Sequence, residues 1–260
     1  MLVPLNHKAE HSWNGVRGVF TDIDDTLTTD GAITADALEA ISALKSAGLH
    51  VIAITGRPVD WSMPFAQEWP VDAIVAENGA VALVKHRKLY QEDTATRATR
   101  FARLQEVATC VQREVPGAVL ASDSAGRETD IAVDHSEFNH LNESQIAQVV
   151  KVMQREGLNA SVSSIHVNGW LGDHNKWQGA CWITRTLFGR ELQGETDRWV
   201  YVGDSTNDQL MFERLPHSVG VANIRRFEAE LQHKPRYITQ GERGAGFAEV
   251  ARTLLKDKGL

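Results

Sequence analysis

The first eighty residues alternate short apolar runs with helical patterns, and this alternation limits the fold more than any other feature of the sequence. Mostly apolar runs lie at residues 16–20, 49–54 and 73–76. Helical patterns lie between them, at 35–47 and near 61–69. Strands that are apolar throughout are buried on both faces, and short strand–helix–strand connections join parallel neighbours. We therefore expect an α/β fold in which helices cover both faces of a parallel sheet.

The middle of the chain has a different pattern. Residues 81–84 and 88–91 flank a turn and predict a hairpin, and helical patterns follow at 96–114 and 143–156. The strands predicted around these helices are short, which favours an antiparallel sheet with helices on one face. We expect residues 81–170 to form a separate α+β unit.

The first pattern then returns. A helix is predicted at 176–188, and an apolar strand at 198–202 precedes further helices and strands. The parallel-sheet domain is therefore predicted to consist of residues 1–80 and 171–260, with the α+β unit inserted between them.

Charge and composition argue against several classes of function. The formal net charge is −7 and there is no basic run, so nucleic acid and anionic membranes are poor candidates as partners. No apolar stretch approaches the ~20 residues that cross a bilayer, and the first fourteen residues lack a hydrophobic segment of the signal type. Cys110 and Cys181 form no CxxC pair and are predicted to be free thiols. We expect a cytoplasmic protein that is a monomer or a small homo-oligomer.

Polar clusters follow several of the predicted strands. Asp22 and Asp24 come directly after the first strand, residues 55–57 (Thr-Gly-Arg) follow the second, and residues 203–208 (Gly-Asp-Ser-Thr-Asn-Asp) follow a later one. Because the carboxyl ends of parallel strands meet at one edge, we expect these clusters to lie close together. Each has an ordinary alternative, such as an acidic turn, a strand-ending turn or a helix cap. Lys176 taken alone is most often a solvated helix lysine.

Taken together, the clusters resemble the haloacid dehalogenase (HAD) superfamily of aspartyl-phosphate hydrolases. That family is marked by DxDx(T/V), a Ser or Thr that ends the second strand, a Lys and GDxxxD, in this order. Residues 22–26, Thr55, Lys176 and residues 203–208 supply all four marks. The resemblance spans nearly the whole chain and implies a Rossmann-like core with an inserted cap.

The position of the insertion is similar to that in the Cof-like, class IIB branch, which includes sucrose-phosphate, trehalose-phosphate and mannosyl-phosphoglycerate phosphatases and phosphomannomutases. Residues 77–80, 220–223 and 244–246 also look like that branch. The resemblance implies an α+β cap of C2B type. Asp25 departs from the branch, which usually has Gly there. Because aspartate tolerates unusual backbone angles, we expect an intact loop, and the effect on phosphate or metal affinity is an open question.

The resemblance implies a role for each matching residue. Asp22 is the nucleophile that forms an aspartyl-phosphate, and Asp24 protonates the leaving oxygen and then activates water. Thr55 donates a hydrogen bond to the phosphate, and Lys176 neutralises phosphate and nucleophile as a point charge. Thr26 holds Asp24 and the turn.

The resemblance also implies a metal ion, Mg²⁺ for preference, bound by oxygen ligands. The implied ligands are the Asp22 carboxylate, the Asp24 backbone carbonyl and Asp204, with Asp208 and Asn207 in support. Substrate contacts are expected from Thr26, Gly56, Arg57, Asn78 and Asn207. The candidates for substrate choice on the cap are Arg127, His135, His166, Asn168 and Trp170, although any one of these is more often an ordinary surface residue of the cap.

The sequence thus predicts a Mg²⁺-dependent phosphatase that acts on a small phosphorylated metabolite, with a sugar phosphate as the favoured class. A phosphomutase of the same superfamily, which returns the phosphate to a second hydroxyl, is one alternative. An alternative of a different class is a non-catalytic, phospho-accepting or binding module of receiver type. Receiver domains are about half as long and carry no such insertion, so the length of this chain argues against that class.

Overall fold

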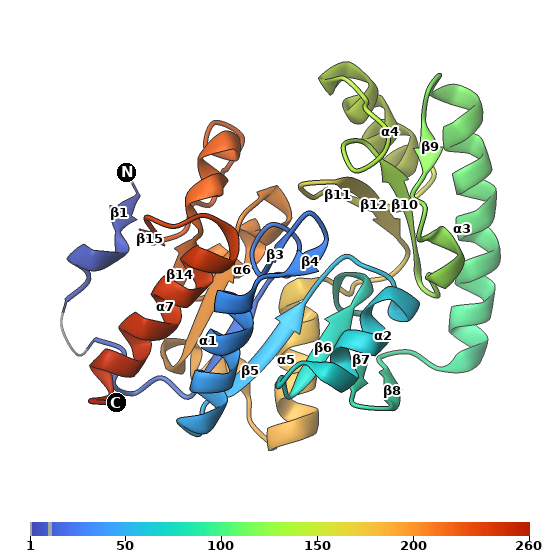
Figure 1. Cartoon of the computed structure of the whole chain (residues 1–260). Coiled ribbons are helices and arrows are strands. Elements are labelled where there is room, and N and C mark those ends of the chain that lie inside the picture. The colour runs from blue at the N-terminus through green and yellow to red at the C-terminus, as the bar shows by residue number, and fades with distance from the viewer. Residues whose placement is uncertain (1, 10–11) are drawn as a thin grey trace.

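The computed structural model describes residues 2–9 and 12–260 and shows a large sheet unit beside a smaller one (Figure 1). Met1, Glu10 and His11 lie outside the described residues. The strand order of the large sheet is β1-β15-β14-β13-β2-β5-β6-β7-β8. Its strands are β1 (Val3–Pro4), β2 (Gly18–Thr21), β5 (His50–Ile54), β6 (Ala73–Ala76), β7 (Val81–Val84), β8 (Arg87–Tyr90), β13 (Trp199–Gly203), β14 (His217–Gly220) and β15 (Tyr237–Ile238).

The centre of the large sheet is parallel. β2 pairs with β5 on one side and with β13 on the other, and parallel pairing continues to β6 in one direction and through β14 and β15 to β1 in the other. Every residue of β2 and of β13 is buried. Burial on both faces explains why these strands are largely apolar, and their parallel direction brings their carboxyl ends to one edge. The predicted α/β fold is confirmed.

Helices cover both faces of this sheet (Figure 1). The helices are α1 (Ala35–Ser46), α2 (Val59–Glu68) and α7 (Arg243–Asp257) on one face, and α5 (Lys176–Phe188) and α6 (Gln209–Arg214) on the other. Successive strand residues point to opposite faces, so Val19 lies in the first apolar core and Phe20 in the second. Of the helices in the described part of the chain, none is both long enough and apolar enough to cross a membrane.

Shorter elements connect these layers. Directly after the first acidic turn, β3 (Thr28–Thr29) and β4 (Ala32–Ile33) pair as a two-stranded antiparallel hairpin. The 3₁₀ helices are η1 (Leu5–His7), η2 (Glu77–Gly79), η3 (Ser124–Gly126), η4 (Leu192–Gly194), η5 (Thr196–Arg198), η6 (Thr206–Asp208) and η7 (Ala222–Phe227).

The smaller unit is an antiparallel sheet with two helices packed against it. Its strand order is β11-β12-β10-β9. Its elements are β9 (Val119–Leu120), β10 (Asp130–Asp134), β11 (Asn159–Val162), β12 (His166–Trp170), α3 (Thr94–Glu114) and α4 (Glu143–Arg155). Leu104 and Val111 of α3, Val149 and Met153 of α4, and Val133 of β10 share one buried cluster. The smaller unit therefore has an apolar core of its own.

The hairpin that was expected in the smaller unit belongs to the large sheet instead. β7 pairs antiparallel with β6, and β8 pairs antiparallel with β7. The chain reverses directly after β6 because all three residues of η2 have positive φ, and Ala82 and Leu83 are then buried on opposite faces of the sheet. The expected range of 81–170 thus starts too early. We propose that the inserted unit spans residues 94–170.

Candidate active site

The turn after β2 places two carboxylates at the carboxyl edge of the large sheet. The Asp22 N–H donates to the Val202 carbonyl of β13 (2.9 Å), so the ladder includes Asp22 and the chain leaves the sheet after it. The Ile23 carbonyl then accepts three backbone N–H groups of the turn. Asp25 has φ 56°, in the left-handed region that Gly adopts most easily and that Asp tolerates. The turn is therefore formed with Asp25 in place.

Three acids and one lysine meet at this edge. One carboxylate oxygen from each of Asp22, Asp204 and Asp208 lies within 4.8 Å of the others. Lys176 Nζ lies 2.5 Å from Asp22 Oδ1 and 2.7 Å from Asp208 Oδ1, and all four side chains are buried. Burial and the neighbouring acids raise the pKa of Asp22 to about 8 and raise the pKa of Asp204 well above its usual value. One lysine thus does not offset the mutual repulsion of the three acids.

The residues present fit a hard divalent cation. Asp204 Oδ1 is buried and has no hydrogen-bond partner among the residues that the structure describes. The acid side chains offer only oxygen atoms as ligands, which Mg²⁺ and Ca²⁺ prefer. A bound cation would also offset the repulsion that raises the two pKa values.

Asp208 fixes the position of the other groups. Its Oδ2 accepts the N–H groups of Asp204 (2.9 Å) and Ser205 (3.1 Å). Its Oδ1 accepts hydrogen bonds from Lys176 Nζ and from the Tyr201 hydroxyl. Burial alone would lower the pKa of Lys176, but the charges of Asp208 and Asp22 outweigh it and raise that pKa, so the ammonium stays charged.

Arg57 bridges the two units over this edge. Its Nε donates to Asp24 Oδ1 (3.0 Å), its Nη1 to Asp123 Oδ2 (3.2 Å) and its Nη2 to Glu137 Oε1 (2.7 Å). The guanidinium also lies over the Trp61 ring, 4.8 Å from its centroid. Burial raises the pKa of Asp24, and Arg57 opposes that shift. Arg57 therefore orients Asp24 and fastens the smaller unit to the core.

A second contact between the units surrounds the buried Asp130. The Gly56 carbonyl accepts from Arg127 Nη1 (2.9 Å) and from Asn168 Nδ2 (3.2 Å). Arg127 Nη1 and Asn168 Nδ2 also donate to Asp130, and Asn78 Nδ2 donates to Asp130 Oδ2 (3.3 Å). Asn78 and Arg127 thus connect the two units.

Two threonines near the acids differ from expectation. The Thr26 hydroxyl is buried and has no hydrogen-bond partner among the described residues, whereas the Thr28 hydroxyl donates to the Ile23 carbonyl (3.1 Å). Thr28 therefore has the turn-holding role that was expected of Thr26. Thr55 is buried, and its Oγ1 accepts the Arg57 N–H (3.0 Å); its contact with a phosphate stays a prediction.

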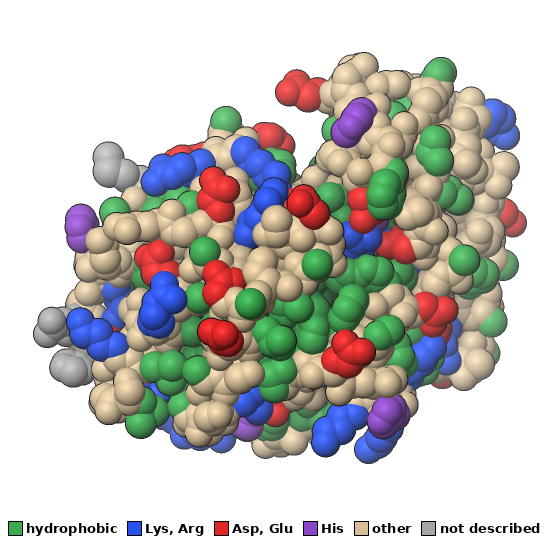
Figure 2. Space-filling model, viewed as in Figure 1, with side chains coloured by type: hydrophobic (Ala, Val, Ile, Leu, Met, Phe, Trp, Pro, Cys, Tyr) green, Lys and Arg blue, Asp and Glu red, His purple; other side chains and the backbone are tan. Residues whose placement is uncertain are grey.

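A small cavity lies between the acidic edge and the β11–β12 turn of the smaller unit. Its volume of ≈ 10 Å³ holds about one water molecule. Charged side chains gather around the hollow between the two units in Figure 2. The lining residues are Asp22, Asp24, Gly56, Arg57, Ser163, Ser164, Ile165, His166, Asn168, Ser205 and Asn207.

The predicted residues divide into those that line this cavity and those that do not. Asn207, Gly56 and Arg57 line it, as do His166 and Asn168 from the cap candidates. The lining does not include Thr26, Thr55, Asn78, Arg127, His135 or Trp170. His135 Nε2 instead lies 3.1 Å from the Ser163 carbonyl, and Trp170 Nε1 donates to the His174 carbonyl (2.8 Å).

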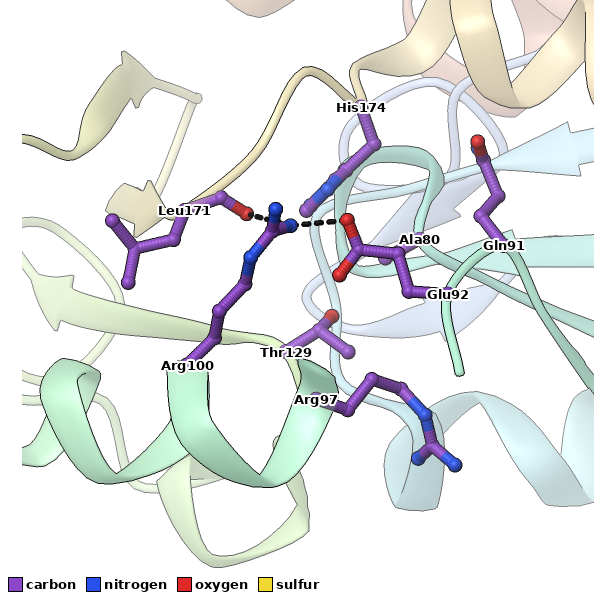
Figure 3. A pocket seen from close by; sticks show the side chains of 8 residues that line it. All are labelled: Ala80, Gln91, Glu92, Arg97, Arg100, Thr129, Leu171 and His174. Atoms are coloured by element: carbon purple, nitrogen blue, oxygen red, sulfur yellow. Dashed lines mark hydrogen bonds and ion pairs between the residues drawn. The ribbon is translucent and has the colours of Figure 1, made fainter. Parts of the chain in front are cut away.

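Another pocket lies beside the first turns of α3, where the two segments that connect the units meet (Figure 3). Arg100 Nη1 donates to the Leu171 carbonyl (3.1 Å) and to Glu92, so one side chain joins both connecting segments. The His174 ring points into this pocket, and its Nε2 has no partner among the described residues. Burial and the charge of Arg100 lower the pKa of His174 to about 4.

Sequence reasoning missed several residues of the site. Asp123, Glu137 and the turn at residues 163–165 come from loops of the smaller unit, where no motif marks them. Tyr201 lies in a strand that is otherwise apolar, so no sequence motif marks its hydroxyl. A polar atom in the middle of a buried strand is a usable signal, because such a group needs a partner.

Comparison with known proteins gives the family. The sequence profile described as haloacid dehalogenase-like hydrolase matches residues 19–156, more than half of the chain. A phosphoglycolate phosphatase of Methanothermobacter thermautotrophicus is 23% identical over 92% of this chain and 99% of its own. A phosphoglycolate phosphatase of Pyrobaculum neutrophilum is 27% identical over 93% of this chain and 96% of its own.

Solved structures share the fold. A Thermoplasma acidophilum protein has a TM-score of 0.70 at 16% identity, covering 92% of this chain and 98% of its own. The sucrose-phosphatase of Synechocystis, solved with sucrose and phosphate, has a TM-score of 0.66 at 15% identity, covering 92% and 98%. A class IIB sugar phosphatase has a TM-score of 0.62 at 16% identity, covering 94% and 99%. With the profile match, the motifs and the fold in agreement, the chain belongs to the haloacid dehalogenase-like hydrolases, in their Cof-like branch.

Proposed function

We propose that this protein is a phosphatase that hydrolyses the phosphate monoester of a small metabolite through an aspartyl-phosphate on Asp22. The observation that carries the proposal is the contact between the buried Asp22 carboxylate and the buried Lys176 ammonium beside a cavity. Hydrolysis of phosphate monoesters is among the slowest uncatalysed reactions, so it needs in-line positioning and positive charge around the phosphoryl group. The relatives named as phosphatases support this reaction class.

The reaction takes two steps. In the first, an Asp22 oxygen attacks phosphorus, the bond from phosphorus to the leaving oxygen breaks, and Asp24 gives its proton to that oxygen. In the second, Asp24 takes a proton from water, whose oxygen attacks phosphorus, and phosphate leaves as Asp22 is restored. Lys176 offsets the negative charge of Asp22 and of the phosphoryl group.

We also propose that Asp22, the Asp24 carbonyl and Asp204 hold Mg²⁺, with Asp208 and Asn207 in support. The unpartnered Asp204 Oδ1 supports this assignment. When bound, the ion neutralises charge on the phosphoryl oxygens. Because four donors already engage the Asp208 carboxylate, its part is to hold the loop.

The polar side chains that the smaller unit places beside the acids favour a hydroxylated substrate such as a sugar phosphate. Ser163, Ser164, His166 and Asn168 offer hydrogen-bonding groups from the smaller unit, which we propose acts as a cap that excludes water. The similarity to a sucrose-phosphatase supports a sugar phosphate, and the relatives named phosphoglycolate phosphatase support a small phosphorylated acid.

A panel of phosphate monoesters, assayed with Mg²⁺ and with a chelator, tests the function. We expect phosphate release to require the ion and to fall by at least about 10³-fold in Asp22→Asn, because that variant lacks the nucleophile. Glu39→Gln, which changes an exposed carboxylate on α1, is the matched control and keeps full activity. Release that survives both the chelator and Asp22→Asn contradicts the proposal.

Product analysis separates the hydrolase from a mutase. A phosphatase releases inorganic phosphate from a hexose phosphate, whereas a phosphomutase yields an isomeric hexose phosphate without free phosphate. Binding of the same esters with no turnover and an intact fold is the outcome that fits a non-catalytic binding module.

A further inference from the structure

A larger cavity adjoins the small one that holds the acids. It has a volume of ≈ 390 Å³ and shares Asp24, Arg57, Ser164 and Ile165 with the small cavity. Small-molecule sites usually fall between about 300 and 1,000 Å³, so the larger cavity has the size of a ligand site and the small one does not. In the proposed reaction Asp24 protonates the leaving oxygen, and Asp24 also lines the larger cavity, so this cavity adjoins the position proposed for the leaving group.

Two arginines from separate elements line the core side of this cavity and converge on Asp25. Arg226 Nη2 donates to Asp25 Oδ2 (2.8 Å), and Arg243 Nε lies 3.1 Å from Asp25 Oδ1. Arg226 Nη2 also donates to Asp204 Oδ2 (3.0 Å). The backbone of Arg243 is fixed as well, because its N–H donates to Asn223 Oδ1 (3.0 Å).

The two arginines have N–H groups that no described residue accepts. No nitrogen of the Arg243 guanidinium makes a hydrogen bond to the described residues, and its Nε, although close to Asp25, is buried without a hydrogen-bond partner; the side chain is 33% exposed. Arg226 pairs with Asp204 as well as with Asp25, whereas Arg243 contacts Asp25 alone. Of the other acids that line the cavity, Asp24 and Glu137 are engaged by Arg57, and Asp30 is exposed to solvent.

We infer that this pair of arginines binds a carboxylate on the leaving group of the substrate, so that the preferred substrates are phosphorylated hydroxy acids or sugar acids. The inference rests on the proposed function, which places the ester oxygen at Asp24. A guanidinium presents two parallel N–H groups that match a carboxylate, and the free end of Arg243 is the available pair. Asp25 accepts a hydrogen bond from Arg226 and attracts Arg243 by charge, which gives a role to the one residue of the turn that departs from the family pattern.

Matched substrates that differ only in the carboxylate test this inference. The pairs are phosphoglycerate with glycerol phosphate, and phosphogluconate with glucitol phosphate. We expect kcat/KM to be at least about tenfold higher for the acid of each pair, and this ratio to fall about tenfold in Arg243→Gln. Arg225→Gln, which changes the exposed neighbour of Arg226, is the control that keeps the ratio. Arg243 is the better variant because Arg226 also contacts Asp204.

Calorimetry makes the result independent of turnover. Asp22→Asn protein, which cannot form the phosphoenzyme, is titrated with both members of each pair, with and without Arg243→Gln. Tighter binding of the acid that disappears in the double variant supports the inference even if no ester is hydrolysed, in which case only the proposed function fails. Equal binding of both members, or an equal effect of Arg243→Gln and Arg225→Gln, overturns it. If a bisphosphate is preferred over either acid, the arginines bind a second phosphate and not a carboxylate, and this outcome also overturns the inference.

Discussion

The two sides of the small cavity beside the acids are built differently. On the core side, Asp22 and Asp204 follow buried parallel strands and Lys176 begins a helix, so the sheet itself fixes where they lie. On the opposite side, the turn at residues 163–165 and Glu137 come from loops of the smaller unit. A rigid sheet edge thus holds the proposed chemistry, while the proposed closure and substrate choice fall to loops.

The largest effect is expected on the core side, from Lys176→Met. Activity should fall by at least about 10³-fold, because Lys176 is the ammonium in contact with Asp22. The free energy of unfolding should also fall by roughly 3–5 kcal/mol, since Asp22 and Asp208 lose their buried partner. Phosphate release and urea denaturation measure the two effects. Lys151→Met, on the exposed face of α4, should change neither. Activity within tenfold of the native protein would remove Lys176 from the mechanism.

The contact between the two sides gives the next effect. Arg57→Gln should lower kcat/KM by about 10²-fold, because it removes the ion pair that orients Asp24 and the ion pair that links the core to Glu137 of the smaller unit. A double-mutant cycle with Glu137→Gln should show a coupling energy of about 0.5–3 kcal/mol for binding of the substrate. Arg87→Gln in the β7–β8 hairpin is the matched control. Additive effects of Arg57→Gln and Glu137→Gln would mean that this bridge does not close the cavity.

The core side could be predicted because strand periodicity and motif order determine it. Once the runs at 16–20, 49–54 and 198–202 are assigned as parallel strands, their carboxyl ends must share an edge, and Asp22, Thr55 and Asp204 follow directly. This reasoning uses only backbone direction. It needs no knowledge of how any side chain packs.

The other side could not be predicted, because loop conformation and the docking of the two units decide it. Nothing near Glu137 in the sequence indicates that it reaches Arg57, eighty residues earlier in the chain. The hairpin at residues 81–90 was misplaced because its pairing with β6 depends on the tight reversal in η2. Asp25 was noted as a departure, but its two arginine partners lie about two hundred residues away and only the fold brings them together.

A smaller effect is expected where the connecting segments meet. Burial and Arg100 lower the pKa of His174 to about 4, below its unfolded value of 6.5, so the neutral ring favours the folded state. Its contribution to stability is present above pH 6.5 and is lost as the pH falls through 4. The loss should be roughly 2 kcal/mol, because the ring keeps some contact with solvent. Thermal unfolding across this range should show a shallower pH dependence in His174→Gln. The exposed His86→Gln should leave the dependence unchanged, and a slope equal in all three proteins would rule out His174 as its source.

The smallest effect distinguishes two neighbouring threonines, one selected by the sequence motif and one by the structure. Thr28→Val removes the hydroxyl that donates to the Ile23 carbonyl, so it should lower the free energy of unfolding by about 1 kcal/mol. Thr26→Val replaces a buried hydroxyl that has no partner among the described residues, so it should leave stability unchanged or raise it slightly. Valine matches the shape of threonine, and each variant therefore controls for the other in urea denaturation. If Thr26→Val proves the more damaging, the motif threonine has a role in the acidic turn after all, and the turn geometry that favours Thr28 is wrong.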